Sequence, residues 1–228
     1  MSYLIIGSSS SIANSLKGLL SKEGFEFITF SRDQNSNTNH FIVDVSDTGK
    51  ELPEITNPLK GIVYLPGTMN LKPFQNLTME NFYDDMKVNF FSMVRCLHKY
   101  IPNLQKESGS SIVLISSIAA TTGLAFHTSI SAAKSALEGF SRSLAAELAP
   151  GIRVNAVAPS LTESNLTKNL LDRPNQRENL SKRHPLQKIG SPEDIAEMIF
   201  FLLTEKSKWI TGQVFHIDGG LSTIKNFQ

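Results

Sequence analysis

Cysteine and tryptophan are scarce in this chain. Of its 228 residues one is cysteine, Cys96, and one is tryptophan. A single cysteine excludes an intramolecular disulfide and suits a reducing compartment, so we expect a cytoplasmic protein. A chain of this length that is 40% hydrophobic can build one well-buried core, which predicts a single domain over residues 1–228.

An excess of charge and a long apolar run are missing as well. The 22 basic and 21 acidic residues give a net charge of +1, so nothing attracts nucleic acid or an anionic membrane. No stretch approaches the roughly 18 apolar residues of a membrane-spanning helix, and the first residues do not resemble a signal peptide. We expect a small-molecule substrate, with neither nucleic acid nor membrane as partner.

Short β-rich runs alternate with segments of helical periodicity. Strands are predicted over 3–6, 25–30, 40–43, 60–65, 110–116 and 213–217. Helices are predicted from Ile12 onward and over 79–100, 129–148 and 192–203. No hairpin signal joins consecutive strands, which predicts an α/β fold: a Rossmann-type, doubly wound parallel sheet in three layers.

In such a sheet, ligands bind where the carboxyl ends of the strands meet. The loops that should converge there follow Ile6, Leu65, Ser116 and Ala158. Two polar stretches, 33–39 and 164–184, are the expected mobile loops.

A serine-rich turn separates the first strand from the first helix. It reads Gly7-Ser-Ser-Ser-Ser-Ile-Ala13, and its backbone N–H groups with the helix dipole can hold a pyrophosphate. A serine-rich helix cap is also a common structural feature, so this segment alone is a weak indication.

Motifs in one order over nearly the whole chain resemble the short-chain dehydrogenase/reductase family. The family's Gly-x-x-x-Gly-x-Gly loop falls on Gly7, Ser11 and Ala13, and the last triplet is similar to that of enoyl-acyl-carrier-protein reductases. Residues 153–159 and 209–220 look like the family's sixth-strand and C-terminal signatures. The chain is similar to 3-oxoacyl-acyl-carrier-protein reductase-like members, which implies a Rossmann fold and a nicotinamide dinucleotide.

The resemblance also implies the residues that line the cofactor. Asp44-Val45 matches the pair that contacts adenine, and Gly67 retains the glycine of the family's Asn-Asn-Ala-Gly segment. The complete expected set is Gly7, Ser9, Ser10, Ser11, Ile12, Ala13, Ser31, Arg32, Asp44, Val45, Leu65, Gly67, Lys134, Pro159, Leu161 and Thr162. The nicotinamide-side threonine position of the family falls on Ser164, and Ser160 replaces the glycine of its Pro-Gly pair. We expect no metal site.

The end of the second strand indicates which dinucleotide is preferred. The segment Phe30-Ser31-Arg32 offers a guanidinium and no acidic acceptor for a ribose 2′-hydroxyl. Arg32 can hold a 2′-phosphate through charge-assisted hydrogen bonds, which favours NADP(H) over NAD(H). The alternative is an ordinary solvated surface arginine.

The family's catalytic frame is present except for one residue. By resemblance, Ser117 polarises the substrate carbonyl, Lys134 holds the nicotinamide ribose, and Asn89 supports a water relay. The tyrosine that transfers the proton should lie four residues before Lys134, where the chain has Ile130. Isoleucine cannot move a proton, and a positioned acid contributes on the order of 10²–10⁴ in rate.

Several groups can replace that acid, and the sequence leaves the choice open. His127 lies seven residues before Lys134, the offset that enoyl reductases of the superfamily use for their tyrosine. Ser129 and Ser131 flank Ile130 but face other directions on a helix. The remaining candidates for the proton donor are Lys134 acting through water and a group of the substrate itself. These residues can also have roles outside catalysis: His127 can be solvated, Ser117 can cap a strand end, and Asn89 can be bonded to backbone.

The sequence therefore predicts an NADP(H)-dependent oxidoreductase that acts on a carbonyl or activated double bond with altered proton delivery. Its rivals are a non-catalytic dinucleotide-binding sensor or pseudoenzyme, and an enzyme that reuses the fold without net redox chemistry. The resemblance further implies a substrate lid around 160–190. It also implies a homodimer or homotetramer formed through the helices 79–100 and 129–148 and the C-terminal segment.

Overall fold

The computed structural model describes residues 2–34 and 39–225 around one parallel sheet. Its strands are β1 Ser2–Ile6, β2 Glu26–Ser31, β3 His40–Ile42, β4 Leu59–Tyr64, β5 Ser110–Ile115, β6 Ile152–Pro159 and β7 Val214–Ile217. The seven strands follow the order β3-β2-β1-β4-β5-β6-β7, and each pairs in parallel with its neighbour. The predicted doubly wound sheet is confirmed, with the strand order reversing between β1 and β4.

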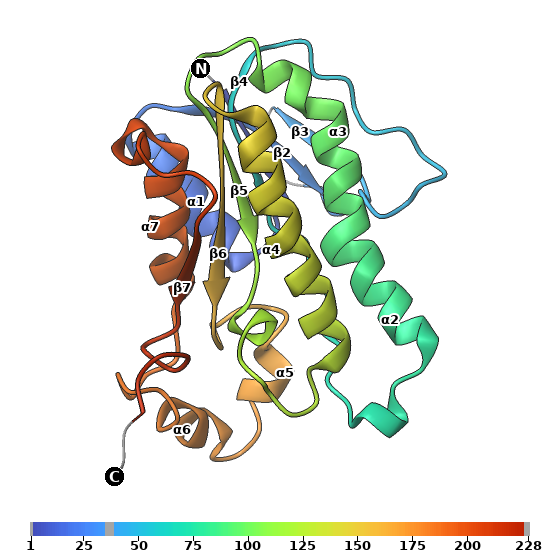
Figure 1. The fold of residues 1–228 in the computed structure, drawn as a ribbon, viewed down its shortest axis with the longest axis vertical. Helices are drawn as coiled ribbons and strands as arrows, with labels where there is room; N and C mark the ends of the chain where they lie inside the picture. The colour runs from blue at the N-terminus through green and yellow to red at the C-terminus, as the bar shows by residue number, and fades with distance from the viewer. Residues whose placement is uncertain (1, 35–38, 226–228) are drawn as a thin grey trace.

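Helices cover both faces of the sheet (Figure 1). The bounds are α1 Ser11–Lys22, α2 Met79–Met86, α3 Ser92–Leu104, α4 Thr128–Leu148, α5 Lys168–Leu171, α6 Gln176–Ser181 and α7 Pro192–Leu203. On β1, Leu4 and Ile6 pack into the core on the α3 and α4 side, whereas Tyr3 and Ile5 pack on the α1 and α7 side. This alternation is what a strand buried on both faces requires, and it confirms the three layers.

Side chains cap the starts of two helices. Thr78 caps α2 in a capping box with Asn81, and Ser191 caps α7 in the same way with Asp194. Pro192 occupies the first turn of α7, where a missing N–H costs nothing.

The helix predicted over 79–100 is not one regular helix, and this part of the prediction is wrong. After α2 the backbone forms a π-helical turn, η2 (Lys87–Phe91), before α3 continues to Leu104. The N–H and the hydroxyl of Ser92 both donate to the carbonyl oxygen of Lys87, the hydroxyl at 2.7 Å. This wider turn contains Asn89, which ties the irregularity to the candidate site.

The expected mobile loops have different outcomes. Of the stretch 33–39, residues 35–38 lie outside the described part of the chain. The stretch 164–184 contains the short helices α5 and α6, which lie beyond the carboxyl ends of β5 and β6 (Figure 1). Short 3-10 helices complete the fold: η1 Phe74–Asn76, η3 Ile118–Ala120 and η4 Glu205–Ser207. Within residues 2–34 and 39–225, no helix combines the length and apolar character needed to span a bilayer.

Candidate functional site

The predicted phosphate loop is held tightly between β1 and the loop after β4. Gly7 has φ +84°, and a Cβ there would lie 2.9 Å from Cδ and N of Pro66. The N–H groups of Gly7 and Ser8 both donate to the carbonyl oxygen of Phe30 at 2.9 Å. Only glycine fits this conformation and this contact, so Gly7 fixes the loop against the end of β2.

Two serines near the start of α1 differ in the hydrogen bonding of their hydroxyls. Ser10 is the N-cap, and its hydroxyl accepts a hydrogen bond of 3.1 Å from the N–H of Ala13. The hydroxyl of Ser8 is buried and has no partner among the described residues. Ala13 is fully buried against the sheet, so a larger side chain would push α1 away from it. A buried hydroxyl without a partner at a helix N-terminus is suited to an anionic ligand.

Lys17 brings a positive charge to the same loop. Its Nζ donates to the carbonyl oxygen of Ser8 at 3.2 Å, and burial lowers the pKa of the amine. The sequence analysis missed Lys17, because a lysine six residues inside an amphipathic helix normally faces solvent.

Arg32 and Asp44 border one cavity at the ends of β2 and β3. The cavity has a volume of about 380 Å³, and its lining residues are Arg32, Ile42, Val43, Asp44, Lys50, Glu51 and Pro53. A hydrogen bond from the Ser46 hydroxyl and, less strongly, the charge of Arg32 hold the pKa of Asp44 below its ordinary value. Val45 is buried beside it, whereas the hydroxyl of Ser31 turns back to Asp33 O at 2.7 Å. Arg32 is thus exposed at the cavity, whereas the Ser31 hydroxyl is bonded within the turn that follows β2.

Asn89 projects from the π turn toward the loop after β4. Its side-chain amide donates to Asp85 O at 2.9 Å and to Thr68 Oγ1 at 3.0 Å. Its Oδ1 is buried with no partner in the described structure, and a Cβ on Gly67 would lie 3.2 Å from it. Leu65 keeps this loop next to β1 by donating to Ile6 O at 2.9 Å. Asn89 is therefore bonded to backbone, as the alternative without a catalytic role predicts. Its Oδ1 is still an acceptor that has no partner in the described structure.

Lys134 reaches the end of β5, where the chain leads into Ser117. The Nζ of Lys134 donates to the carbonyl oxygen of Ile115 at 2.7 Å, two residues before Ser117. Burial lowers the pKa of Lys134 from 10.5 to about 8, and the negative charge of Asp85 acts in the opposite direction. The Ser117 hydroxyl accepts from the N–H of Ala119 at 3.2 Å, so it caps η3 while keeping its own hydrogen for another acceptor.

Ile130 lies one helical turn before Lys134 on α4 and is 4% exposed. It presents an apolar side chain on the helix face that carries Lys134. The His127 ring instead donates from Nδ1 to Ala125 O at 2.7 Å, and no hydrogen bond of the described structure joins it to Lys134, Ser117 or Asn89. Lys134 thus reaches the end of β5, two residues before Ser117, whereas the imidazole of His127 is bonded within its own loop.

The carboxyl end of β6 continues into a segment with its own polar network. Thr162 is buried, and its hydroxyl donates to Ser160 O at 3.2 Å. The Ser160 hydroxyl is 2.9 Å from Nε2 of the buried His184, whose Nδ1 is 2.9 Å from Leu180 O. Pro159 ends β6 and Leu161 follows it half-buried. The polar groups of Ser160, Thr162 and His184 therefore bind one another or nearby backbone carbonyls.

Asp85 is the second residue that the sequence analysis missed. It is fully buried on α2, one turn before Asn89, among residues of the apolar stripe Phe82, Met86 and Phe90. A carboxylate within an apolar helix face is the signal that could have found it.

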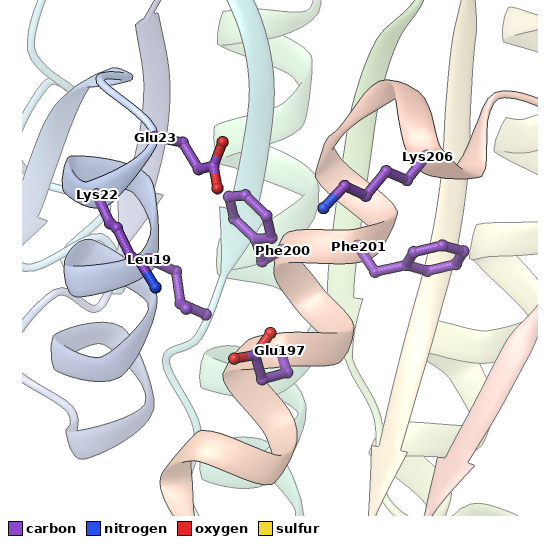
Figure 2. A pocket seen from close by; sticks show the side chains of 7 residues that line it. All are labelled: Leu19, Lys22, Glu23, Glu197, Phe200, Phe201 and Lys206. Carbon is purple, nitrogen blue, oxygen red and sulfur yellow. The ribbon is translucent and has the colours of Figure 1, made fainter.

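The other cavity of note lies far from these residues. It has a volume of about 290 Å³ and lies between the C-terminal turns of α1 and α7. Figure 2 shows the ring of Phe200 between the two helices with the amine of Lys206 directed toward it, 5.6 Å from the ring centroid. This cavity contains none of the predicted site residues.

Comparison with known proteins identifies the family. The family described as Enoyl-(Acyl carrier protein) reductase matches residues 42–222. The 3-oxoacyl-acyl-carrier-protein reductase FabG of Aquifex aeolicus is 34% identical over 176 residues, 75% of this chain and 70% of the relative. The corresponding enzyme of Buchnera aphidicola subsp. Schizaphis graminum is 31% identical over 95% of this chain and 86% of its own.

Solved structures agree in fold over almost the whole chain. Thermoplasma acidophilum aldohexose dehydrogenase in ligand-free form superposes with a TM-score of 0.89 at 23% identity, covering 100% of this chain and 96% of that one. ElxO with NADP bound superposes with a TM-score of 0.85 at 25% identity, covering 96% and 98%. The extent of the sequence matches to the family and to its reductases shows that this chain belongs to the short-chain dehydrogenase/reductase family.

Proposed function

We propose that this protein is an NADP(H)-dependent oxidoreductase that reduces a carbonyl or an activated double bond, with the proton delivered by Lys134. The observation that carries this proposal is the buried Lys134 amine at the end of β5, beside Ser117, with isoleucine one turn before it. The resemblance to 3-oxoacyl-acyl-carrier-protein reductases supports the reaction class, and the NADP held by ElxO supports the cofactor.

The residues of the phosphate loop fit a dinucleotide. Gly7 has no space for a Cβ, the buried hydroxyl of Ser8 has no partner among residues 2–34 and 39–225, and Ala13 lets α1 approach the sheet. Arg32 would hold the 2′-phosphate and the Asp44-Val45 pair the adenine. When bound, NADPH supplies the hydride of the reduction.

Three side chains then handle the proton and the substrate oxygen. With a pKa of about 8, Lys134 is mostly an ammonium at neutral pH and sits in the range in which a general acid works best. The Ser117 hydroxyl can donate to the substrate oxygen because its own oxygen already accepts from Ala119. Asn89 Oδ1 is a buried acceptor that a relay water would need. Ile130 takes no part except to exclude water.

A non-catalytic dinucleotide-binding protein is the second candidate. The buried apolar side chain of Ile130 favours it, since nothing at that position can give a proton to an alkoxide. Under this alternative the cofactor binds and no substrate is turned over.

Cofactor titration followed by turnover assays separates the two. We expect calorimetry to show NADPH binding more tightly than NADH, and slow NADPH oxidation with one member of a panel of ketones and enoyl thioesters. Lys134→Met should abolish turnover, whereas Lys134→Arg should keep part of the cofactor affinity. Binding without turnover across the panel would favour the second candidate, and no binding of either cofactor below millimolar would overturn the proposal.

We extend the proposal to a substrate lid formed by residues 160–190. The segment contains α5 and α6 beyond the carboxyl ends of β5 and β6, and it leaves Leu166 and Leu186 exposed, 51% and 65%. Exposed leucines above the crevice suit an apolar substrate portion. Leu166→Ser should raise KM for a long acyl substrate without changing cofactor affinity.

We also propose a homodimer or homotetramer. Met79, Tyr83 and Phe91 are 62%, 62% and 59% exposed along α2 and η2, and a partner copy would cover them. Sedimentation showing only a species of 25.2 kDa at micromolar concentration would contradict this.

A further inference from the structure

A buried carboxylate lies at the centre of the candidate site. Asp85 is 0% exposed, and both of its oxygens accept hydrogen bonds. Thr68 Oγ1 donates to Oδ1 at 2.7 Å, Asn70 Nδ2 to Oδ1 at 3.1 Å, and Ser129 Oγ to Oδ2 at 2.7 Å. Acceptance at both oxygens is the pattern of an ionised carboxylate, and three donors are what such a group needs away from water.

The three donors come from different elements. Thr68 and Asn70 belong to the loop after β4, which also contains Gly67. Ser129 lies in the first turn of α4, directly before Ile130. The carboxylate therefore fastens the β4 loop and the start of α4 to α2. The Ser129 hydroxyl also lies 3.5 Å from the carbonyl oxygen of Asn70, which adds a second contact between α4 and the β4 loop.

Asp85 also supports Asn89. Thr68 Oγ1 accepts from Asn89 Nδ2 at 3.0 Å while it donates to Asp85, so amide, hydroxyl and carboxylate form a chain. The Asp85 backbone carbonyl takes the second N–H of the same amide at 2.9 Å. Both amide hydrogens are thereby directed at this network, and Oδ1 is left free for the site.

The charge of Asp85 acts on Lys134. Burial lowers the pKa of the Lys134 amine to about 8, and the field of Asp85 limits that fall. Opposite charges attract each other more strongly away from bulk water, so this effect favours the ammonium.

Other charged groups on the elements around α4 are engaged elsewhere. Glu138, one turn beyond Lys134, accepts from the Ser116 hydroxyl at 2.7 Å and lies 4.0 Å from Arg142. Arg153 of β6 donates to Leu202 O and Ser207 Oγ on the opposite face of the sheet. Lys87 of η2 is exposed and acts on Asp44, and Glu80, Tyr83 and Asp84 of α2 are exposed.

We infer that Asp85 is a positioning residue of this site, which holds Thr68, Asn70 and Ser129 in place and, through Thr68, directs the Asn89 amide. The inference rests on the proposed function for its catalytic meaning, since Asn89 and Lys134 are residues that the proposed reduction uses. The network itself is a property of the protein without cofactor or substrate.

The direct test follows the Lys134 amine by NMR in protein labelled with ¹⁵N at lysine Nζ, with Lys134→Met identifying the resonance. In the wild type the amine should titrate near pH 8. In Asp85→Asn the pKa of Lys134 should fall by about 1. Asp84→Asn, which removes an exposed charge from the neighbouring position of α2, should leave it unchanged.

Two outcomes overturn the inference: an unchanged Lys134 titration in Asp85→Asn, and an equal shift in Asp84→Asn. Ser129→Ala is the second test if Asp85→Asn fails to fold. It removes one hydrogen bond to the carboxylate and no charge, so it should lower thermal stability and leave the Lys134 titration nearly in place. An unchanged melting temperature in Ser129→Ala would also contradict the positioning role.

A pH profile connects the network to the reaction. If the proposed function holds, NADPH-dependent reduction by Asp85→Asn should lose rate at a pH about 1 lower than the wild type does. If no substrate is reduced at all, the proposed function fails while the titration still decides the role of Asp85.

Discussion

The amine of Lys134 donates a 2.7 Å hydrogen bond to the carbonyl oxygen of Ile115, which places a buried positive charge where β5 ends. Burial lowers the pKa of this amine from 10.5 to about 8. The environment that makes the ammonium a better acid also makes it costly to the folded state, and the two consequences can be measured separately.

Reductase activity should decline as the pH rises through about 8. The ammonium is the proton donor, so the rate is highest below the pKa of Lys134 and is lost above it. We would measure kcat for NADPH-dependent reduction across the pH range, together with His127→Ala as a control. If the imidazole of His127 were the acid, turnover would vanish in that variant, and this result would contradict the assignment.

Lys134→Met should stabilise the protein at neutral pH. The folded-state pKa of about 8 is below the unfolded value of 10.5, so the folded chain pays for the charge at pH values under 8 and is relieved of it as the pH approaches 10.5. The stability advantage of Lys134→Met should therefore shrink by about 3 kcal/mol between pH 8 and 10.5. Urea unfolding of both proteins across this window measures the difference, and a constant difference would show that the amine is not buried as described.

Arg32→Ala should weaken NADPH binding by about 1.5–3 kcal/mol and leave NADH almost unaffected, because the guanidinium meets only the 2′-phosphate. Calorimetry with both cofactors measures the effect. Arg142→Ala, which removes an exposed arginine of α4, is the matched control and should change neither affinity. Equal losses for the two cofactors in Arg32→Ala would mean that another cation, such as Lys17, makes the distinction.

Gly7→Ala should destabilise the fold by about 1–3 kcal/mol, since the position has φ +84° and its Cβ would meet Pro66 at 2.9 Å. Gly18→Ala is the natural comparison, because its Cβ meets nothing within 4 Å in the middle of α1. That variant should stabilise by about 0.5–1 kcal/mol. Urea midpoints of the two variants that move in the same direction would contradict the described loop.

Much of the fold could be predicted because local chemistry decides it. The β-rich runs, the Thr78 and Ser191 caps and the apolar stripes of the long helices each specify one element. The π turn at Lys87–Phe91 could not be predicted, since one extra residue in a turn hardly disturbs a periodicity of three or four. The short helices α5 and α6 carry too few residues to show any period.

The candidate site was predictable where motifs name residues and not where contacts decide. Ser117, Lys134 and Asn89 fall on the motif positions of the family. Asp85 acquires its role from Thr68 and Ser129, which lie 17 and 44 residues away in the chain. Such a network depends on how α2 meets α4, and spacing along one sequence does not contain that information.

The most direct test of the account is the reduction of an activated ketone with NADPH by the wild type, Ile130→Tyr and Ile130→Phe. Ile130 projects from α4 one turn before Lys134, so a tyrosine there would place a phenol beside the buried amine and near Ser117. We predict slow turnover by the wild type, an increase of about 10²-fold or more in Ile130→Tyr, and no increase in Ile130→Phe, which adds the ring without the hydroxyl. Fast reduction by the wild type that neither substitution nor Lys134→Met alters would contradict the central claim, because it would place the proton donor elsewhere.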